Sequence, residues 1–261
     1  MTAKMTKGDY EYLEPIEVSK NIYWVGFYDE KANLHCNPYL LKDDKEVVIF
    51  DPGSIIDYPK VASKIFSLVE QSQVDYIVLH HQDPDLCASV SFFEDIIRNK
   101  NLKIVTHTRA SVLIRYYGIR SDFYIVDKND YSLTLKSGRS LKFMVTPFLH
   151  SPASIVTYDE TSKVLFSSDL FGAISKEWTL YAEEGYQDKM RIFHEGYMPS
   201  NDVLRASLEK IDRLDINMIL PQHGSIIKGE MVRKCIDYLK QLKCGIDLAK
   251  SEEELYGWIK T

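Results

Sequence analysis

The sequence predicts a layered α/β protein in which helices cover a β-sheet. Short apolar runs typical of strands alternate, along nearly the whole chain, with stretches whose apolar residues recur at helical spacing. The 261 residues suffice for one large domain with its own core. No Pro/Gly/Ser-rich linker, low-complexity tract or short-period repeat divides the chain. We therefore expect a single domain over residues 1–261.

The first half of the chain supplies most of the predicted strands. These short apolar runs are Ile22–Phe27, Tyr39–Leu41, Val47–Phe50, Tyr76–Leu79, Lys103–Thr106 and Phe123–Val126. Apolar residues at helical spacing predict intervening helices at Pro59–Val69, Leu86–Arg98 and Arg109–Tyr117. This alternation is expected of a sheet covered by helices.

The second half begins with two predicted hairpins. Their strands are Ser132–Leu135 with Lys142–Thr146, around the turn KSGR, and Ser154–Tyr158 with Val164–Ser167, around YDETSK. The remaining predicted elements are a helix at Asp202–Arg213, a strand at Met218–Leu220 and a helical stretch near Gly229–Ala249.

Composition and charge exclude several classes of function. The formal net charge is −6 and no stripe of Lys and Arg is present to follow phosphates, so we expect no nucleic-acid partner. No apolar run has the length of a bilayer span, and the N-terminal MTAKMTKGDYEYLEPIEV lacks a signal-peptide core, so we expect no membrane partner. The cysteines form no CxxC pair, which favours a reduced, cytoplasmic setting and argues against disulfides and Cys-ligated metals.

Ionisable residues directly follow several of the predicted strands. The stretch YIVLHHQDPDL, residues 76–86, passes from an apolar strand to His81, and three other residues stand just past apolar runs: His150, Asp169 and His223. Strand ends converge at one edge of a sheet, where α/β proteins place their sites. We therefore expect these residues to lie together.

The segment after His81 adds two carboxylates. Pro84 disfavours the helical region for Asp83, so the chain is expected to stay extended there. In an extended chain, His81, Asp83 and Asp85 share one face. They would repel each other unless a cation lay between them. A helix predicted to start at Leu86 would also bring its N-terminus, which favours negative charge, close to them.

Taken singly, these residues also have ordinary structural explanations. These are a helix N-cap, a partly buried loop histidine, a turn residue and a helix-start histidine, for Asp85, His150, Asp169 and His223 in turn. The other histidines are expected to be structural: His80 faces away from His81, and His35, His107 and His194 have no clustered carboxylate, although His35 and His194 could line a pocket. The six candidates as a set indicate a metal site more strongly than any one of them.

The order of these motifs resembles the metallo-β-lactamase superfamily. The blocks are His81-x-Asp83-x-Asp85, then His150, Asp169 and His223, with DPG at Asp51–Gly53 after an early strand. Within the superfamily the chain is similar to the di-iron domain of flavodiiron proteins, which the strings LFSSDLFGA, YMPSN and LPQHG also resemble. It looks most like the stand-alone oxygen-binding di-iron proteins linked to bacterial chemotaxis. The resemblance implies a four-layer αββα sandwich with the metal site at one edge.

The resemblance also implies a distribution of ligands between two metals. His81, Asp83 and His150 would bind one metal, Asp85 and His223 the other, and Asp169 would bridge both. The sequence departs from the family pattern at two positions. Asp83 replaces the usual Glu, and Leu86 replaces a histidine that is a ligand in the zinc hydrolases of the superfamily but typically not in flavodiiron proteins. Leu86 therefore argues against a hydrolase.

Two iron ions are the cofactors that the resemblance implies. Three imidazoles and three carboxylates without a thiolate suit Fe, and they also suit Mn or Zn. We expect no flavin in this chain, because it has no Gly-rich phosphate loop and because SEEELYGWIKT follows soon after the last predicted helix.

The expected function is dioxygen binding. Two ferrous ions give two electrons, which take dioxygen to the peroxide level, and a persistent di-ferric peroxo or oxo adduct suits sensing better than turnover. Chemotaxis signalling proteins are the partners that the resemblance implies. Three alternatives stay open: an oxygen or nitric oxide reductase fed by a separate donor, a zinc-dependent hydrolase, and a metal-stabilised binding module. No catalytic residue is assigned, and a homodimer stays among the alternatives.

Overall fold

Two β-sheets form the centre of the computed structural model, which describes residues 12–29, 34–176 and 178–249. The first sheet contains β1 (Ile16–Ser19), β2 (Ile22–Trp24), β5 (Tyr39–Lys42), β6 (Val47–Phe50), β7 (Val74–Val78), β8 (Lys103–Thr106) and β9 (Asp122–Ile125), in that order. The second contains β10 (Ser132–Thr134), β11 (Ser140–Val145), β12 (Ile155–Asp159), β13 (Val164–Ser168), β14 (Met218–Pro221) and β15 (Ile227–Lys228), also in that order. A separate ribbon pairs β3 (Phe27–Asp29) with β4 (Leu34–Cys36).

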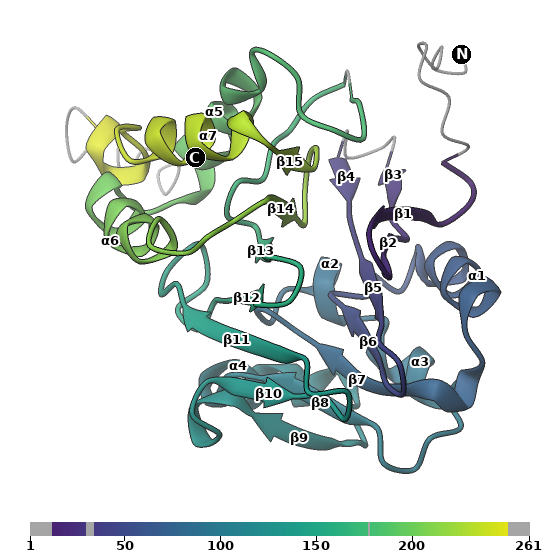
Figure 1. Ribbon diagram of the computed structural model, residues 1–261. Coiled ribbons are helices and arrows are strands. Elements are labelled where there is room, and N and C mark those ends of the chain that lie inside the picture. Colours follow the sequence, from purple (N-terminus) through teal and green to yellow (C-terminus); the bar gives the residue numbers. More distant parts are fainter. Residues whose placement is uncertain (1–11, 30–33, 177, 250–261) are drawn as a thin grey trace.

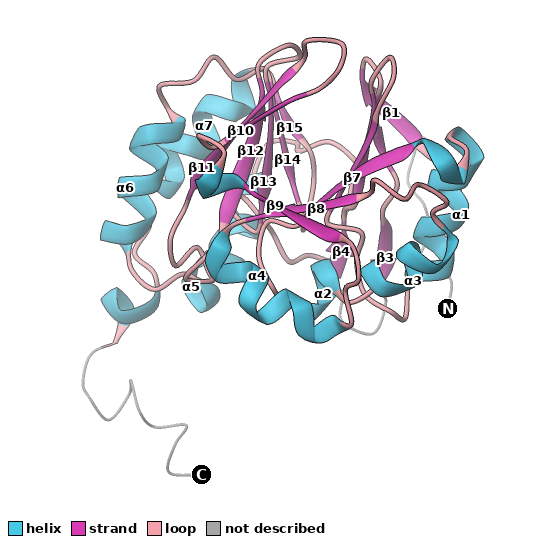
Figure 2. Ribbon diagram, turned by 90° about the horizontal axis from the view of Figure 1, so that it is seen from below, coloured by secondary structure: helices cyan, strands magenta, loops and turns pink. Residues whose placement is uncertain are grey.

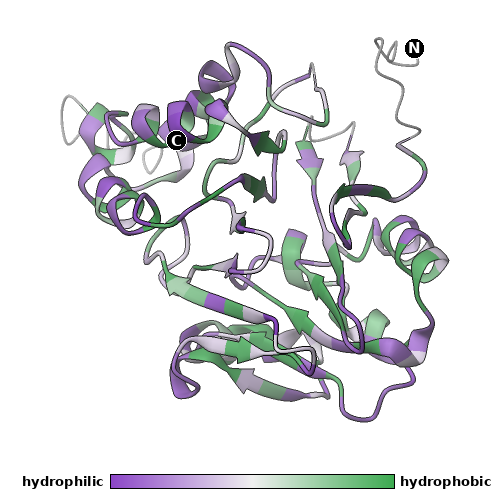
Figure 3. Cartoon of the chain, in the orientation of Figure 1, coloured by the Kyte–Doolittle hydropathy of each residue, from purple (hydrophilic) through white to green (hydrophobic). Residues whose placement is uncertain are grey.

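Helices cover the outer face of each sheet (Figure 1; Figure 2). The first sheet is covered by α1 (Tyr58–Leu68), α2 (Pro84–Cys87), α3 (Val90–Ile96) and α4 (Thr108–Ile114). The second is covered by α5 (Tyr186–Tyr197), α6 (Asn201–Ile211) and α7 (Glu230–Leu239). Figure 3 shows both hydrophobic and hydrophilic residues along α6 and α7, as expected of helices that bury one side.

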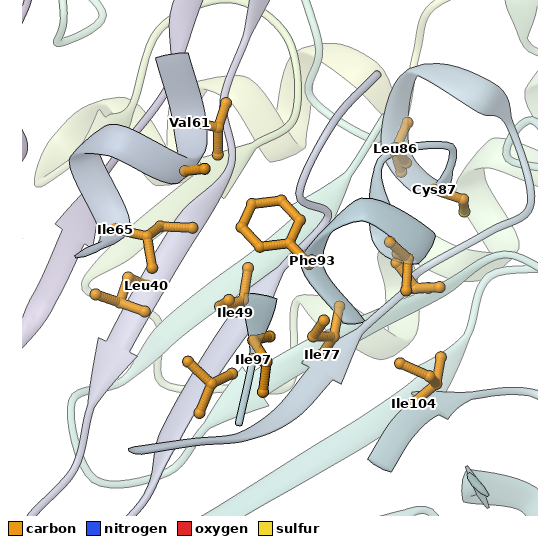
Figure 4. Close-up of a cluster of buried hydrophobic side chains, with 14 of the residues drawn as sticks. Leu40, Ile49, Val61, Ile65, Ile77, Leu86, Cys87, Phe93, Ile97 and Ile104 are labelled. Carbon is orange, nitrogen blue, oxygen red and sulfur yellow. The ribbon is translucent and has the colours of Figure 1, made fainter. Parts of the chain in front are cut away.

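Three hydrophobic cores separate the layers. Between the first sheet and its helices, Phe93 of α3 points into a cluster with Ile49 and Ile77 (Figure 4). A second core lies between the other sheet and α5–α7. The third lies between the sheets, where Phe50 and Phe166 stack with ring centroids 3.8 Å apart. A helix–sheet–sheet–helix order follows, so the predicted four-layer αββα sandwich is confirmed.

Strand directions bring several strand ends to one edge of the sandwich. In the first sheet β6, β7, β8 and β9 run parallel. In the second, β13 and β14 run parallel, and β11 points the same way because both β11 and β13 are antiparallel to β12. In the second sheet, the loops that follow β11, β13 and β14 therefore start at the same end of the strands. In the first sheet, the loop that follows β7 starts at the same end as those that follow its parallel neighbours.

Some elements differ from the sequence predictions. The predicted strand Ile22–Phe27 is divided between β2 and β3, and the predicted helix Leu86–Arg98 is divided into α2 and α3. The prediction missed β1, β4, β15 and α5. Helix α5 is hard to recognise because two of its four buried residues, Tyr186 and His194, carry polar groups. The C-terminal stretch forms α7 only to Leu239, followed by a 3-10 turn at Gly245–Leu248.

Two predictions concern the ends of the chain. Residues 1–11 and the segment SEEELYGWIKT lie outside the described residues. Within the described ranges, no helix combines the length and apolar character that crossing a membrane requires.

Candidate metal centre

The structure brings all six predicted residues together at one edge of the sandwich. A first group surrounds Oδ2 of Asp169, which lies 3.3 Å from His81 Nε2 and 2.8 Å from His150 Nε2. Asp83 completes this group, because its Oδ2 lies 3.7 Å from His81 Nε2 and 3.3 Å from His150 Nε2. We call His81, Asp83 and His150, with Asp169 Oδ2, the first subsite.

A second group surrounds the other oxygen of the same carboxylate. His223 Nε2 lies 3.4 Å from Asp169 Oδ1 and 3.2 Å from Asp85 Oδ2. We call Asp85 and His223, with Asp169 Oδ1, the second subsite. One buried carboxylate thus faces both groups.

The spacing of these atoms fits metal ligands. Ligand atoms about 2.1 Å from one ion lie about 3 to 3.5 Å apart in octahedral or tetrahedral geometry. The six distances above range from 2.8 to 3.7 Å. In addition, the buried His81 Nε2 and Asp169 Oδ1 have no hydrogen-bond partner. Buried polar atoms normally have one, so both atoms are free to bind ions.

The pKa shifts in the cluster show that its carboxylates stabilise positive charge. Burial would lower the pKa of His81, but Asp169 and Asp83 outweigh it and raise that pKa to about 10. Burial would raise the pKa of Asp169, but His81, His150 and His223 hold it well below its usual range. The carboxylates therefore favour cations between them, which protons or metal ions supply.

The segment formed by the β7–α2 loop and the first turn of α2 supplies three of the six residues. Asp83 occupies the N-cap position in an extended conformation, as predicted from Pro84. The helix begins at Pro84, however, not at Leu86, because proline is well suited to the first helical position. Asp85 therefore lies in the first helical turn, so the predicted extended face through residue 85 is wrong, and so is its alternative assignment as an N-cap.

A buried hydrogen-bonded chain fixes this loop to both sheets. Asp51, just after β6, accepts a hydrogen bond from His80 N and lies 2.5 Å from His80 Nδ1. On its other side, His80 Nε2 lies 2.8 Å from Thr157 Oγ1 of β12. His80 thus faces away from the cluster, as expected. The role of Asp51 and Thr157 was not apparent from the sequence beyond the DPG motif.

Two of the histidines are oriented through Nδ1. His223 Nδ1 donates to the carbonyl oxygen of His35 at 2.9 Å, which fixes the ring so that Nε2 faces Asp85 and Asp169. His81 Nδ1 lies 3.0 Å from Ser168 Oγ. Gly224 permits the turn after His223, because its φ is +85° and a Cβ would lie 2.4 Å from Tyr186 Oη. His223 therefore lies in the β14–β15 connection and not at a helix start.

The first subsite is also held together by polar side chains near the surface. Gln82 Nε2 donates to Asp83 Oδ1 at 3.0 Å, and Gln82 Oε1 accepts from Ser151 Oγ at 2.7 Å. This amide connects the loop that carries Asp83 with the loop that carries His150. Asp83 reaches the cluster although it is one methylene shorter than Glu.

The other histidines have structural positions. His35 is buried between the rings of Tyr28 and Trp178. His194 is buried and accepts from Phe171 N. His107 caps α4 by accepting from Arg109 N. The expectation that His107 has no carboxylate nearby is wrong, because Asp127 Oδ1 lies 3.8 Å from its Nε2.

Leu86 belongs to the hydrophobic core on the helix side of the first sheet and is fully buried. The second subsite therefore has three protein side chains, Asp85, Asp169 and His223, and no histidine from position 86. Exposure also differs within the centre. The side chain of Asp85 is 38% exposed, whereas those of His81 and His223 are 0% and 3% exposed.

Comparison with known proteins identifies the family of this chain. A family model described as ODP family beta lactamase matches residues 34–224. The chain belongs to this family. The resemblance to the metallo-β-lactamase superfamily and to flavodiiron cores is thereby confirmed.

Proteins of several kinds are similar to this chain. An uncharacterized protein of Methanocaldococcus jannaschii is 31% identical over 242 residues, which cover 86% of this chain and 60% of that protein. An anaerobic nitric oxide reductase flavorubredoxin of Pectobacterium atrosepticum is 26% identical over 247 residues, covering 86% of this chain and 48% of that protein. The chain thus spans about half to three-fifths of the length of these curated relatives.

Two solved structures of a chemotaxis sensor ODP match nearly their whole length. One, described as a peroxy diiron species, has a TM-score of 0.75 at 29% identity and covers 89% of this chain and 97% of that chain. The other, an apo state from T. denticola, has a TM-score of 0.77 at 29% identity and covers 90% and 96%.

Proposed function

We propose that residues 1–261 form one domain that holds two iron ions, binds dioxygen and signals iron and oxygen to a partner protein. The observation that carries this proposal is Asp169, whose two carboxylate oxygens face different groups of ligand atoms. His81, Asp83 and His150 would hold the first iron, Asp85 and His223 the second, with Asp169 shared between them. The similarity to a chemotaxis sensor described as a peroxy diiron species supports the choice of iron and dioxygen.

The arrangement of the chain suits the uptake of a small ligand. When bound, two ferrous ions supply one electron each to dioxygen. The second subsite offers only three side chains, which leaves room for further ligands as in open metal sites. Its exposed member, Asp85, lies on the solvent side, while Asp169 is 2% exposed. The buried histidines keep their rings fixed through His35 and Ser168.

Signalling requires that a change at the centre reach the surface. The β7–α2 and β11–β12 loops contact each other through Asp83 and His150 and through Gln82 and Ser151. A change in how Asp83 or His150 holds a metal would therefore act on both loops. Phe148, in the second loop, is 49% exposed, so such a movement is accessible to a partner. Chemotaxis proteins are the proposed partners in a cytoplasmic setting.

Anaerobic iron loading followed by air tests the proposal. We expect two irons per chain and an absorption band that appears on air and decays slowly. His81→Ala and Asp169→Ala should both abolish that band. Hydrogen exchange should differ between reduced and oxygenated protein in residues 83–86 and 150–154. Fewer than two irons, or no band in the unaltered protein, would overturn the proposal.

A second candidate function is reduction of oxygen or nitric oxide. The observation that favours it is the 26% identity to a nitric oxide reductase flavorubredoxin. It requires electrons from a separate donor, such as a reduced flavoprotein or rubredoxin. Rapid repeated turnover in anaerobic stopped-flow with such a donor would favour the reductase, and a single slow cycle would favour the sensor.

A further inference from the structure

A buried amide from a distant part of the chain bonds the turn that carries His223 on both sides of that residue, beside a further bond from Trp178 Nε1 to the carbonyl oxygen of Gly224. The Nδ2 group of Asn37 donates to the carbonyl oxygen of Pro221 at 3.0 Å and to that of Gly224 at 2.8 Å. These two carbonyls flank His223 on either side in the sequence. Asn37 is completely buried, so no water replaces these bonds when they are removed.

The orientation of this amide is determined by its other end. Asn37 Oδ1 accepts a hydrogen bond from Trp24 Nε1 at 2.8 Å. An indole N–H is only a donor, so the atom facing Trp24 must be the oxygen. Both N–H groups of Asn37 therefore point at the turn, and each has an acceptor. The amide is fully satisfied in one orientation only.

Neighbours of Asn37 hold the same turn. The backbone N–H of Asn37 donates to Gln222 O at 2.8 Å, and Tyr39 Oη donates to Pro221 O at 3.0 Å. His223 Nδ1 itself donates to His35 O. Hydrogen bonds from segment 35–39 thus stabilise the conformation of the turn. Among the loops that carry the six candidate residues, these hydrogen bonds go to the turn of His223.

We propose that Asn37 is a positioning residue for the second subsite. It holds the backbone on both sides of His223, so that Nε2 stays 3.2 Å from Asp85 Oδ2 and 3.4 Å from Asp169 Oδ1. The first subsite does not depend on it, because His81 is oriented by Ser168, and Asp83 by Gln82. This inference rests on the two-iron site proposed above.

Anaerobic titration with ferrous ions, followed by equilibrium dialysis, tests this role. Asn37→Asp keeps the shape of the side chain and its acceptor for Trp24 but removes both donors to the turn. We expect one iron to bind as in the unaltered protein and the second to bind at least about 10-fold more weakly. Asn201→Asp is a matched control, because Asn201 Nδ2 also donates to two carbonyl oxygens, of Lys240 and Leu242, far from the centre in sequence. It should bind both irons normally.

Double variants identify the subsite that is affected. In a His223→Ala background, which retains only the first subsite, Asn37→Asp should have no further effect on iron binding. In a His81→Ala background, it should weaken the iron that remains. If Asn37→Asp weakened the remaining iron by the same factor in both backgrounds, Asn37 would have a general structural role and not the proposed positioning role. Equal weakening of both irons in the single variant Asn37→Asp would lead to the same conclusion.

A milder variant tests the same role if Asn37→Asp does not fold. Tyr39→Phe removes only the hydroxyl that donates to Pro221 and should weaken the second iron by a few-fold without affecting the first. Unchanged binding of both irons in Tyr39→Phe and in a folded Asn37→Asp would overturn the inference alone. If the unaltered protein binds fewer than two irons, the proposed function fails first and Asn37 has no second iron to position.

Discussion

The two subsites share Asp169 but are built in different ways. The first joins side chains of two loops near the surface, where Gln82 links Asp83 to the loop of His150. The second depends on a turn whose backbone carbonyls are held by the buried Asn37. The link of the first subsite joins two loops, whereas the bonds of the second hold the backbone of one turn. Under the proposed function, the second subsite would receive the small ligand and the first would transmit the change.

The shared carboxylate gives the largest expected effect. Asp169→Asn replaces a charged bridge by a neutral amide, and its single oxygen serves one subsite at most. We expect both irons to be lost or to bind at least about 100-fold more weakly, since each loses a charged ligand in a buried setting. Metal analysis after anaerobic loading measures this.

Asp215→Asn is a suitable control, because Asp215 is an exposed carboxylate paired with Lys163. It should leave two irons bound. Two irons bound with unchanged affinity in Asp169→Asn would contradict the bridging arrangement.

Removal of one histidine separates the subsites. His81→Ala should lose the first iron and keep the second, and His223→Ala should do the reverse, because each ring faces one oxygen of Asp169. Each variant should therefore bind one iron. If either variant binds two irons, or both bind none, the division of ligands drawn here is wrong.

The sequence predicts the ligands better than it predicts what holds them. His81, Asp83 and Asp85 stand close in the chain, and Pro84 fixes the local conformation of Asp83. His150, Asp169 and His223 were predictable from the strands that precede them. By contrast, the partners Asn37, Ser168 and Thr157 depend on which strands pair. The register shift between β13 and β14, which places Ser168 opposite Pro221, leaves no trace in local spacing.

Metal binding should also stabilise the fold, through each subsite separately. A ligand at about 100 times its dissociation constant adds about 2.7 kcal/mol to the free energy of unfolding, which raises the melting temperature by about 5–10 °C in a chain of this size. Two irons should give about twice the rise that one gives. Anaerobic calorimetry of the unaltered protein and of His223→Ala, with and without ferrous ions, measures both values. An equal rise in the two proteins would mean that the second iron does not bind the folded state.

The smallest effect concerns the partner of His81. Ser168→Ala removes the hydroxyl beside Nδ1, so the ring keeps its packing but loses the bond that fixes its tautomer. We expect the first iron to bind about 10-fold more weakly, which corresponds to about 1.4 kcal/mol, with no change at the second. Ser111→Ala removes another buried hydroxyl that donates to a backbone carbonyl and should change neither affinity. If Ser168→Ala weakened both irons equally, the second subsite would depend on the first, and the contrast between them would not hold.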